Sequence, residues 1–152
     1  MITKYEIPIN INSSFWFSNA SIYEENDDGS LHFESGYIDS GETIMRFSTI
    51  ENTVASGRSG SFPYLYEGDT VEMIIDADFS ENWKPSMRIE AFTPADKRVF
   101  EFSKEGTRII FKTMQNNFRY DLHLTGIFTG YGSANLRKLT TTIWPKGEYP
   151  DD

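Results

Sequence analysis

Hydrophobic and polar residues alternate in several short segments of the chain, which is the pattern of half-buried β-strands. The clearest is residues 118–124, with four large apolar side chains on one face and Arg119, Asp121 and His123 on the other. Residues 71–79 also alternate, and a strand explains their pattern better than a helix. Segments of similar character are residues 4–11, 22–24, 31–34, 43–50, 87–92, 107–112 and 136–144.

Residues 93–106 are compatible with two different structures. Thr93 could cap a helix that begins at Pro94 and ends at Gly106. Alternatively, residues 94–97 form a hairpin turn, and Phe100 and the residues around it alternate as a strand. We favour the hairpin because a single short helix would interrupt an otherwise consistent strand pattern.

Short clusters of Gly, Asp, Asn and Ser separate these segments, as expected for strands joined by turns. No helix is available to cross between parallel strands, so the pairing should be antiparallel. We therefore predict an all-β, antiparallel, jelly-roll-like β-sandwich of about nine strands. The 152 residues suit one domain, 1–152, with residues 1–17 as an attachment strand or arm. The alternative for that segment is an edge strand of the same sandwich.

The composition of the chain limits the classes of partner and the kinds of site that it can have. The formal net charge is −9, which disfavours nucleic acid and anionic membranes as partners because no concentrated basic patch offsets it. Three Trp, eight Tyr and twelve Phe are too many large rings for a disordered acidic chain. The absence of Cys excludes disulfides and Cys-based zinc sites. The opening residues 1–4 lead directly into an alternating segment, so we expect neither a secretory signal nor membrane insertion.

The order of features in residues 61–143 resembles that of carbohydrate-binding-module-like jelly-roll sandwiches. Residues 62–71 look like the entry into a core strand, residues 87–92 like its paired strand, and residues 118–124 like the late strand before the closing one. The family's frequent closing Asp near a structural calcium has no counterpart in residues 136–143. The resemblance therefore implies the fold and glycan recognition, but no metal site and no cofactor.

A second resemblance is carried by Pro63, Leu65 and Gly68, which form a Pro-x-Leu-x-x-Gly entry, and by the same order of strands. Both are similar to the small sandwich protein of bacterial accessory Sec systems. That resemblance implies a cytosolic component that assists the export of glycosylated adhesins through protein partners.

Sugar recognition needs flat apolar rings, with planar polar side chains at their edges. Trp83 lies in a polar segment, residues 80–85, where it could be exposed for binding or packed at the edge of the core. The candidate carbohydrate-binding residues are Trp83, Tyr64, Tyr66, Arg58 and Tyr131. Further candidates are Tyr37 as a ring and Asn82, Arg119 and Asp121 as polar partners.

Catalysis and metal binding have weaker signals. His32 and His123 both fit ordinary strands, as hydrogen-bonded or solvent-facing side chains. Residues 57–60 do not form a nucleophile elbow, and no carboxylate pair is singled out as an acid and a nucleophile. Asp27 and Asp28, near two glutamates, could collect calcium ligands, but the spacing favours an Asp-Gly hairpin turn.

These observations favour a non-catalytic binding and assembly module. Our first expectation is a phage virion protein of the tail or baseplate type, made in the host cytoplasm. Its partners would be copies of itself, neighbouring structural proteins and a cell-surface polysaccharide. The alternative is a cytoplasmic export-assembly protein of the accessory Sec type. A small glycan-processing enzyme is the third interpretation.

Overall fold

The computed structural model describes residues 1–9, 16–17, 22–36, 40–48, 65–115 and 118–150. Eleven strands and no helix occur in this part of the chain. The strands are β1 (Thr3–Pro8), β2 (Trp16–Phe17), β3 (Ile22–Glu25), β4 (Leu31–Ser35), β5 (Met45–Ser48), β6 (Thr70–Phe79), β7 (Trp83–Phe92), β8 (Arg98–Glu105), β9 (Arg108–Lys112), β10 (Arg119–Phe128) and β11 (Gly132–Trp144).

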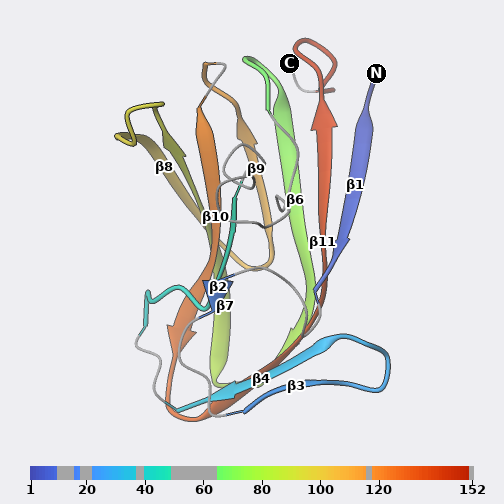
Figure 1. Ribbon diagram of the computed structural model, residues 1–152, viewed down its shortest axis with the longest axis vertical. Helices are drawn as coiled ribbons and strands as arrows, with labels where there is room; N and C mark the ends of the chain where they lie inside the picture. The colour runs from blue at the N-terminus through green and yellow to red at the C-terminus, as the bar shows by residue number, and fades with distance from the viewer. Residues whose placement is uncertain (10–15, 18–21, 37–39, 49–64, 116–117, 151–152) are drawn as a thin grey trace.

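The strands form two antiparallel sheets (Figure 1). Sheet A has the order β3-β4-β11-β6-β9, with β1 paired to β11 beyond the end of β4. Sheet B has the order β2-β5-β10-β7-β8. Strands β4 to β7 alternate between the sheets, and so do β8 to β11 after the β7–β8 hairpin in sheet B, as in a jelly roll. The predicted all-β sandwich is confirmed.

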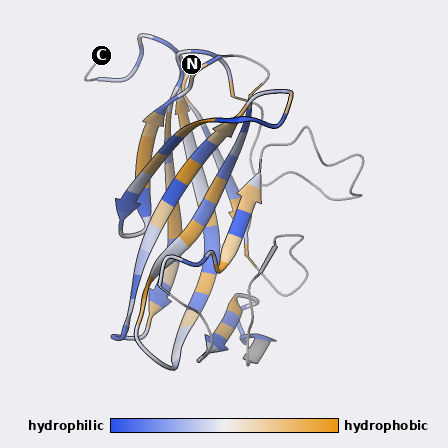
Figure 2. Ribbon diagram, turned by 90° about the vertical axis from the view of Figure 1, so that its left-hand side faces the viewer, coloured by the Kyte–Doolittle hydropathy of each residue, from blue (hydrophilic) through white to orange (hydrophobic). Residues whose placement is uncertain are grey.

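The core lies between the sheets and is built from every second residue of the long strands. Val71, Met73 and Ile75 of β6 are buried, as are Leu122 and Leu124 of β10. This alternation is visible as bands along the strands in Figure 2. The apolar faces read from residues 71–79 and 118–124 are therefore the faces that the two sheets bury against each other.

Residues 93–97 form the turn of the β7–β8 hairpin, so the hairpin prediction is confirmed and the helix is excluded. Asp96 takes a left-handed conformation with φ of 64°, which Asp tolerates in tight turns. The Asp-Gly turn is confirmed as well: Gly29 has φ of 88°, and Asp28 Oδ1 accepts a hydrogen bond from the Ser30 N–H at 2.9 Å, closing the β3–β4 hairpin.

The predicted polar loop over residues 80–85 is wrong at its end, because β7 already begins at Trp83. Pro85 is tolerated inside sheet B because its carbonyl accepts a hydrogen bond from the Gly106 N–H at 2.8 Å. The C=O and N–H groups of one strand residue point to the same side of the strand. The side on which Pro85 lacks an N–H therefore faces the β8–β9 turn, and no hydrogen bond to β10 is lost. Opposite Pro85, a Cβ on Gly126 would lie 2.4 Å from the Lys84 carbonyl oxygen, so this close approach requires glycine.

Candidate functional site

Of the predicted sugar-binding residues that the structure describes, Trp83, Asn82 and Tyr131 lie near one another and Tyr66 lies apart from them. Tyr37, Arg58 and Tyr64 lie outside the described residues. Tyr66 is 61% exposed and precedes β6, whereas Tyr131 is 55% exposed and precedes β11. Because the start of β6 pairs with the end of β11, these two rings lie at opposite ends of the sandwich.

Trp83 is 2% exposed, the placement expected if it packs at the edge of the core. Its ring centroid lies 5.3 Å from that of Phe128 and 6.0 Å from that of Phe33. The indole Nε1–H donates to the Gly130 carbonyl oxygen at 3.3 Å. Both ring faces are therefore withdrawn from solvent, and the polar edge is satisfied within the protein.

Asn82 holds the loop between β10 and β11 in place. Its amide donates to the carbonyl oxygens of Thr129 at 2.8 Å and Tyr131 at 2.7 Å. The Tyr131 hydroxyl in turn donates to Glu34 Oε1 at 2.7 Å. The Asn82 amide group is thus committed to loop structure, while the Tyr131 ring stays exposed at this end of the molecule.

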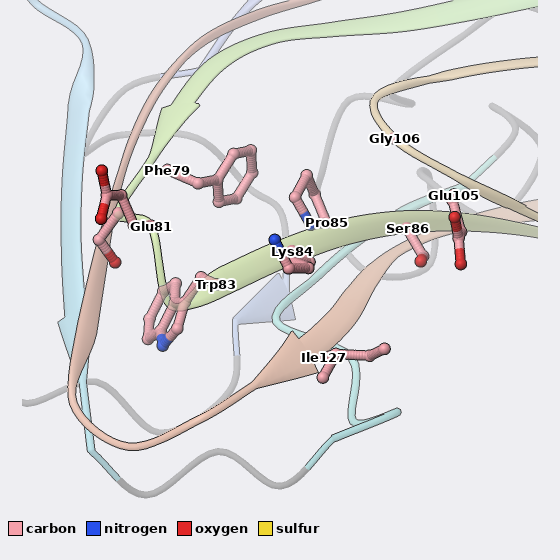
Figure 3. Close-up of a pocket in the computed structure, with 10 residues that line it drawn as sticks. Phe79, Glu81, Trp83, Lys84, Pro85, Ser86, Glu105, Gly106 and Ile127 are labelled. Carbon is pink, nitrogen blue, oxygen red and sulfur yellow. The ribbon is translucent and has the colours of Figure 1, made fainter.

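A cavity of about 440 Å³ lies beside Trp83, where β6 leads into β7 and the β8–β9 turn comes near. Figure 3 shows the Phe79 ring, at the end of β6, next to Pro85 of β7. Lys84 and Trp83 lie further along β7, toward its beginning. Its charged lining residues are Glu81, Lys84 and Glu105. The cavity therefore combines apolar walls with charged groups of both signs.

The outer face of sheet B carries an ordered set of charges, defined here as the charged face. It consists of the side chains of β5, β10, β7 and β8 that point away from the core. Register pairing arranges them in three rows across the strands. The rows are Arg46, His123, Arg88 and Ser103; then Ser48, Asp121, Glu90 and Glu101; then Arg119, Phe92 and Arg98.

Glu90 is the centre of this face. It is 6% exposed, and its Oε2 accepts a hydrogen bond from Arg98 at 2.9 Å. Its Oε1 lies 2.6 Å from His123 Nε2 and 3.8 Å from Arg88 Nε. Burial opposes ionisation, but the Arg98 hydrogen bond and the charges of His123, Arg88 and Arg98 lower the pKa of Glu90 on balance.

Asp121, 3% exposed, lies beside Glu90 in the same row. Ser48 donates to its Oδ1 at 2.7 Å, and Arg119 Nε lies 3.3 Å from that oxygen. Arg119 also donates to Asp96 at 2.6 Å, and its guanidinium lies 4.3 Å above the centre of the Phe92 ring. Arg119 and Asp121, predicted as sugar partners, are therefore engaged with protein groups on this face.

His123 is held between oppositely acting neighbours. Burial lowers the pKa of His123, the nearby Arg88 and Arg46 lower it further, and Glu90 and Asp121 counteract them. A neutral ring fits its contacts, since Nδ1 can accept from the Thr43 hydroxyl at 2.9 Å. The prediction that both histidines are hydrogen-bonded strand residues is confirmed, since His32 contacts Glu34 and Asn135.

Sequence reasoning missed Arg46, Arg88 and Glu90 as members of one site. They lie on separate strands, and alternation assigns a residue to a face without naming its neighbour. The available signal was the polar half of residues 87–92 and of residues 118–124, two segments that were both predicted as strands.

Burial raises the pKa of Asp69, the shift an enzymatic acid would need. Asp69 Oδ2 accepts a hydrogen bond from the Tyr66 N–H at 3.3 Å, within the turn that precedes β6. This carboxyl group does not line the cavity described above.

Among the described residues, no group of three or more His, Asp or Glu side chains is arranged to hold a metal ion. The described strands and loops also contain no helix of the length and apolarity that crossing a membrane requires.

No protein-family model and no curated protein matches the sequence. Solved structures do match the fold. A chain in the crystal structure of accessory secretory protein 1, 2 and 3 in Streptococcus pneumoniae has a TM-score of 0.73 and 13% identity. That match covers 90% of this chain and 95% of the other.

Two further structures are similar. A chain of the Glycosylation Associate Protein (Gap123) complex from Streptococcus agalactiae has a TM-score of 0.63 and 17% identity, over 89% of this chain but 44% of that one. The xylan-binding module CBM15 has a TM-score of 0.50 and 12% identity, over 95% of this chain and all of that one. Both resemblances seen in the sequence are therefore confirmed as likenesses of fold.

Proposed function

We propose that this chain is a non-catalytic binding and assembly module that works through protein partners, as a small cytoplasmic subunit of an export-assisting complex. The observation that carries the proposal is the match in the structure of accessory secretory protein 1, 2 and 3, which spans nearly all of both chains. A second match is to a chain from a structure also described as a complex, of which this chain covers less than half.

The side chains most suited to catalysis support a binding role. His32 lies between Glu34 and Asn135, and His123 lies between Thr43 and Glu90. Each histidine is thus engaged by neighbours that fix its position in a strand. Glu90, the buried carboxylate of the charged face, is paired with Arg98 and has a lowered pKa, whereas a general acid needs a raised one.

Glycan recognition is the second candidate function, favoured by the likeness to the xylan-binding module and by the cavity beside Trp83. The phage virion role rests on the sequence alone, because none of the three structures named above is described as a virion protein. The virion interpretation and the export interpretation both require protein contacts, and they differ in where the complex forms.

Co-expression with the products of the genes beside its own, followed by native mass spectrometry, tests the proposal. We expect a complex of fixed stoichiometry that contains this chain and persists through purification. Recovery of the chain only in purified phage particles would support the virion role and overturn the export role. Binding of the chain to neutral xylo-oligosaccharides on a glycan array, without formation of any protein complex, would support glycan recognition instead.

A further inference from the structure

Buried nitrogen donors without acceptors are concentrated on the charged face. Of the described residues, five have a buried side-chain nitrogen or oxygen atom that lacks a hydrogen bond. Two are threonine hydroxyls, of Thr70 and Thr141, and the other three are Arg88 Nε, Arg119 Nε and His123 Nε2. All three nitrogens belong to the charged face. The last two have a carboxylate oxygen nearby, at 3.3 Å and 2.6 Å, but not in hydrogen-bonding geometry. Buried donors of this kind call for an acceptor.

The first row of the charged face is also short of negative charge. Arg46 pairs in register with His123, and His123 pairs with Arg88, so two arginines flank one imidazole on adjacent strands. The neutral imidazole does not offset the charge of either arginine. Arg88 has one carboxylate contact, at 3.8 Å, and exposed Arg46 has none among the residues described. Four of the seven arginines of this acidic chain lie on the charged face: Arg46, Arg88, Arg98 and Arg119.

We propose that the row of Arg46, His123 and Arg88 is a docking site for a carboxylate-rich, extended segment of a partner protein. The ligand would supply the negative charge that the row lacks and acceptors for the accessible guanidinium N–H groups of Arg46 and Arg88. This inference rests on the proposed function, in that it identifies how one protein partner is recognised.

The geometry of the row suits an extended peptide. Arg46 and Arg88 lie on strands separated by β10, so their backbones are roughly 10 Å apart. Carboxylates two residues apart point to the same side of an extended chain, with backbones about 7 Å apart, and the long Arg and Glu side chains can span the remaining difference, so one carboxylate can meet each guanidinium. Arg46 is exposed, and the Arg88 side chain is about a quarter exposed, so an incoming segment can reach both.

An acidic peptide fits this face better than an acidic polysaccharide. Sugar rings are recognised by stacking on aromatic faces. Among the described residues of the charged face, the aromatic side chain is Phe92, and the Arg119 guanidinium covers one side of its ring. On the described parts of β5, β10, β7 and β8, the face therefore offers more cations than aromatic rings, which suits a carboxylate-rich peptide better than a sugar.

Hexaglutamate is a suitable probe, and isothermal titration at low ionic strength measures its affinity for the whole chain. We expect wild-type protein to bind it, and Arg46→Gln with Arg88→Gln to weaken binding by about tenfold or more. The matched control is Arg108→Gln with Lys138→Gln, which removes the same charge from surface ion pairs of sheet A and should change affinity by less than about twofold. Exposed Arg46→Gln alone should give a partial loss and is the variant to use if the double variant does not fold.

Three results would overturn the assignment: no binding of hexaglutamate, equal losses in both double variants, or stronger binding of oligogalacturonate than of the peptide. The outcome is separable from the test of the proposed function. If the complex forms but hexaglutamate does not bind, the docking site is wrong and the assembly role stands. If hexaglutamate binds through Arg46 and Arg88 but no complex forms, the site stands and the assembly role is wrong.

Discussion

Gly132 is the residue that makes room for Trp83 in the core. A Cβ at position 132 would lie 2.1 Å from the indole Nε1, and the ring cannot move freely because Phe33 and Phe128 pack against it. We expect Gly132→Ala to lower the free energy of unfolding by about 2–3 kcal/mol through overpacking. Urea denaturation monitored by tryptophan fluorescence or circular dichroism measures this loss.

A second substitution distinguishes a clash with Trp83 from any other destabilising effect of alanine at this position of β11. Trp83→Phe removes the indole nitrogen, so Gly132→Ala should cost about 1 kcal/mol less in the Trp83→Phe background than in wild type. Strictly additive losses would show that the alanine acts through something other than contact with Trp83.

His32 makes the stability depend on pH. The hydrogen bond to Glu34 at 2.5 Å and the contact with Asn135 raise the pKa of His32 above its ordinary 6.5, although burial opposes them. A raised pKa in the folded state means that the protonated ring stabilises the fold. That contribution is complete below about pH 6.5 and is lost as the pH rises through the raised value. Conversely, the His32 hydrogen bond lowers the pKa of Glu34, whose contribution is lost in acid.

The free energy of unfolding of wild type and His32→Gln, measured from about pH 5.5 to about pH 9, tests this coupling. The difference between the two proteins should be largest at the acidic end and shrink as the pH rises. Glu34→Gln is the companion variant, because it removes the largest cause of the shift. NMR titration should then find a lower pKa for His32, and an unchanged pKa would contradict the role of Glu34.

At the scale of elements, alternation identified the strands that bury a whole face. Residues 71–79 and 118–124 became β6 and β10 because one side of each contacts the core and the other does not. The same rule placed the β7–β8 hairpin correctly. It failed at Trp83 and Pro85, whose polar neighbours indicated a loop. Their strand conformation depends on Gly126, Gly130 and Gly106, which belong to other parts of the sequence.

The candidate site was less predictable than the strands that form it. Arg119 and Asp121 were recognisable as polar partners within one segment. Glu90 lies beside Asp121 only because β7 and β10 pair in one particular register, in which a shift by one residue would move it to the core side. Charge rows are thus a product of pairing between distant segments, and a single sequence contains no direct record of that pairing.

At the scale of the whole molecule, the beginning of the chain is tied to its end. β1 pairs with residues 138–143 of β11, and the N-terminal amine lies 2.9 Å from Glu148. Figure 1 shows β1 starting at the end of the sandwich where β11 finishes. This is the position of an edge strand in sheet A. The attachment interpretation of residues 1–17 requires, by contrast, that the segment can leave without harming the fold.

Deletion of residues 1–8 distinguishes the two roles. If β1 is part of the sandwich, the deletion removes six cross-strand pairs and should lower the free energy of unfolding by roughly 1–4 kcal/mol. Hydrogen exchange at residues 138–143 should accelerate too, because that edge of β11 loses its partner. Lys4→Ser with Glu6→Ser is the control, since it keeps the backbone pairing and removes only exposed charges. An unchanged stability together with loss of complex formation would instead identify the segment as an attachment arm, because the fold would then be complete without it.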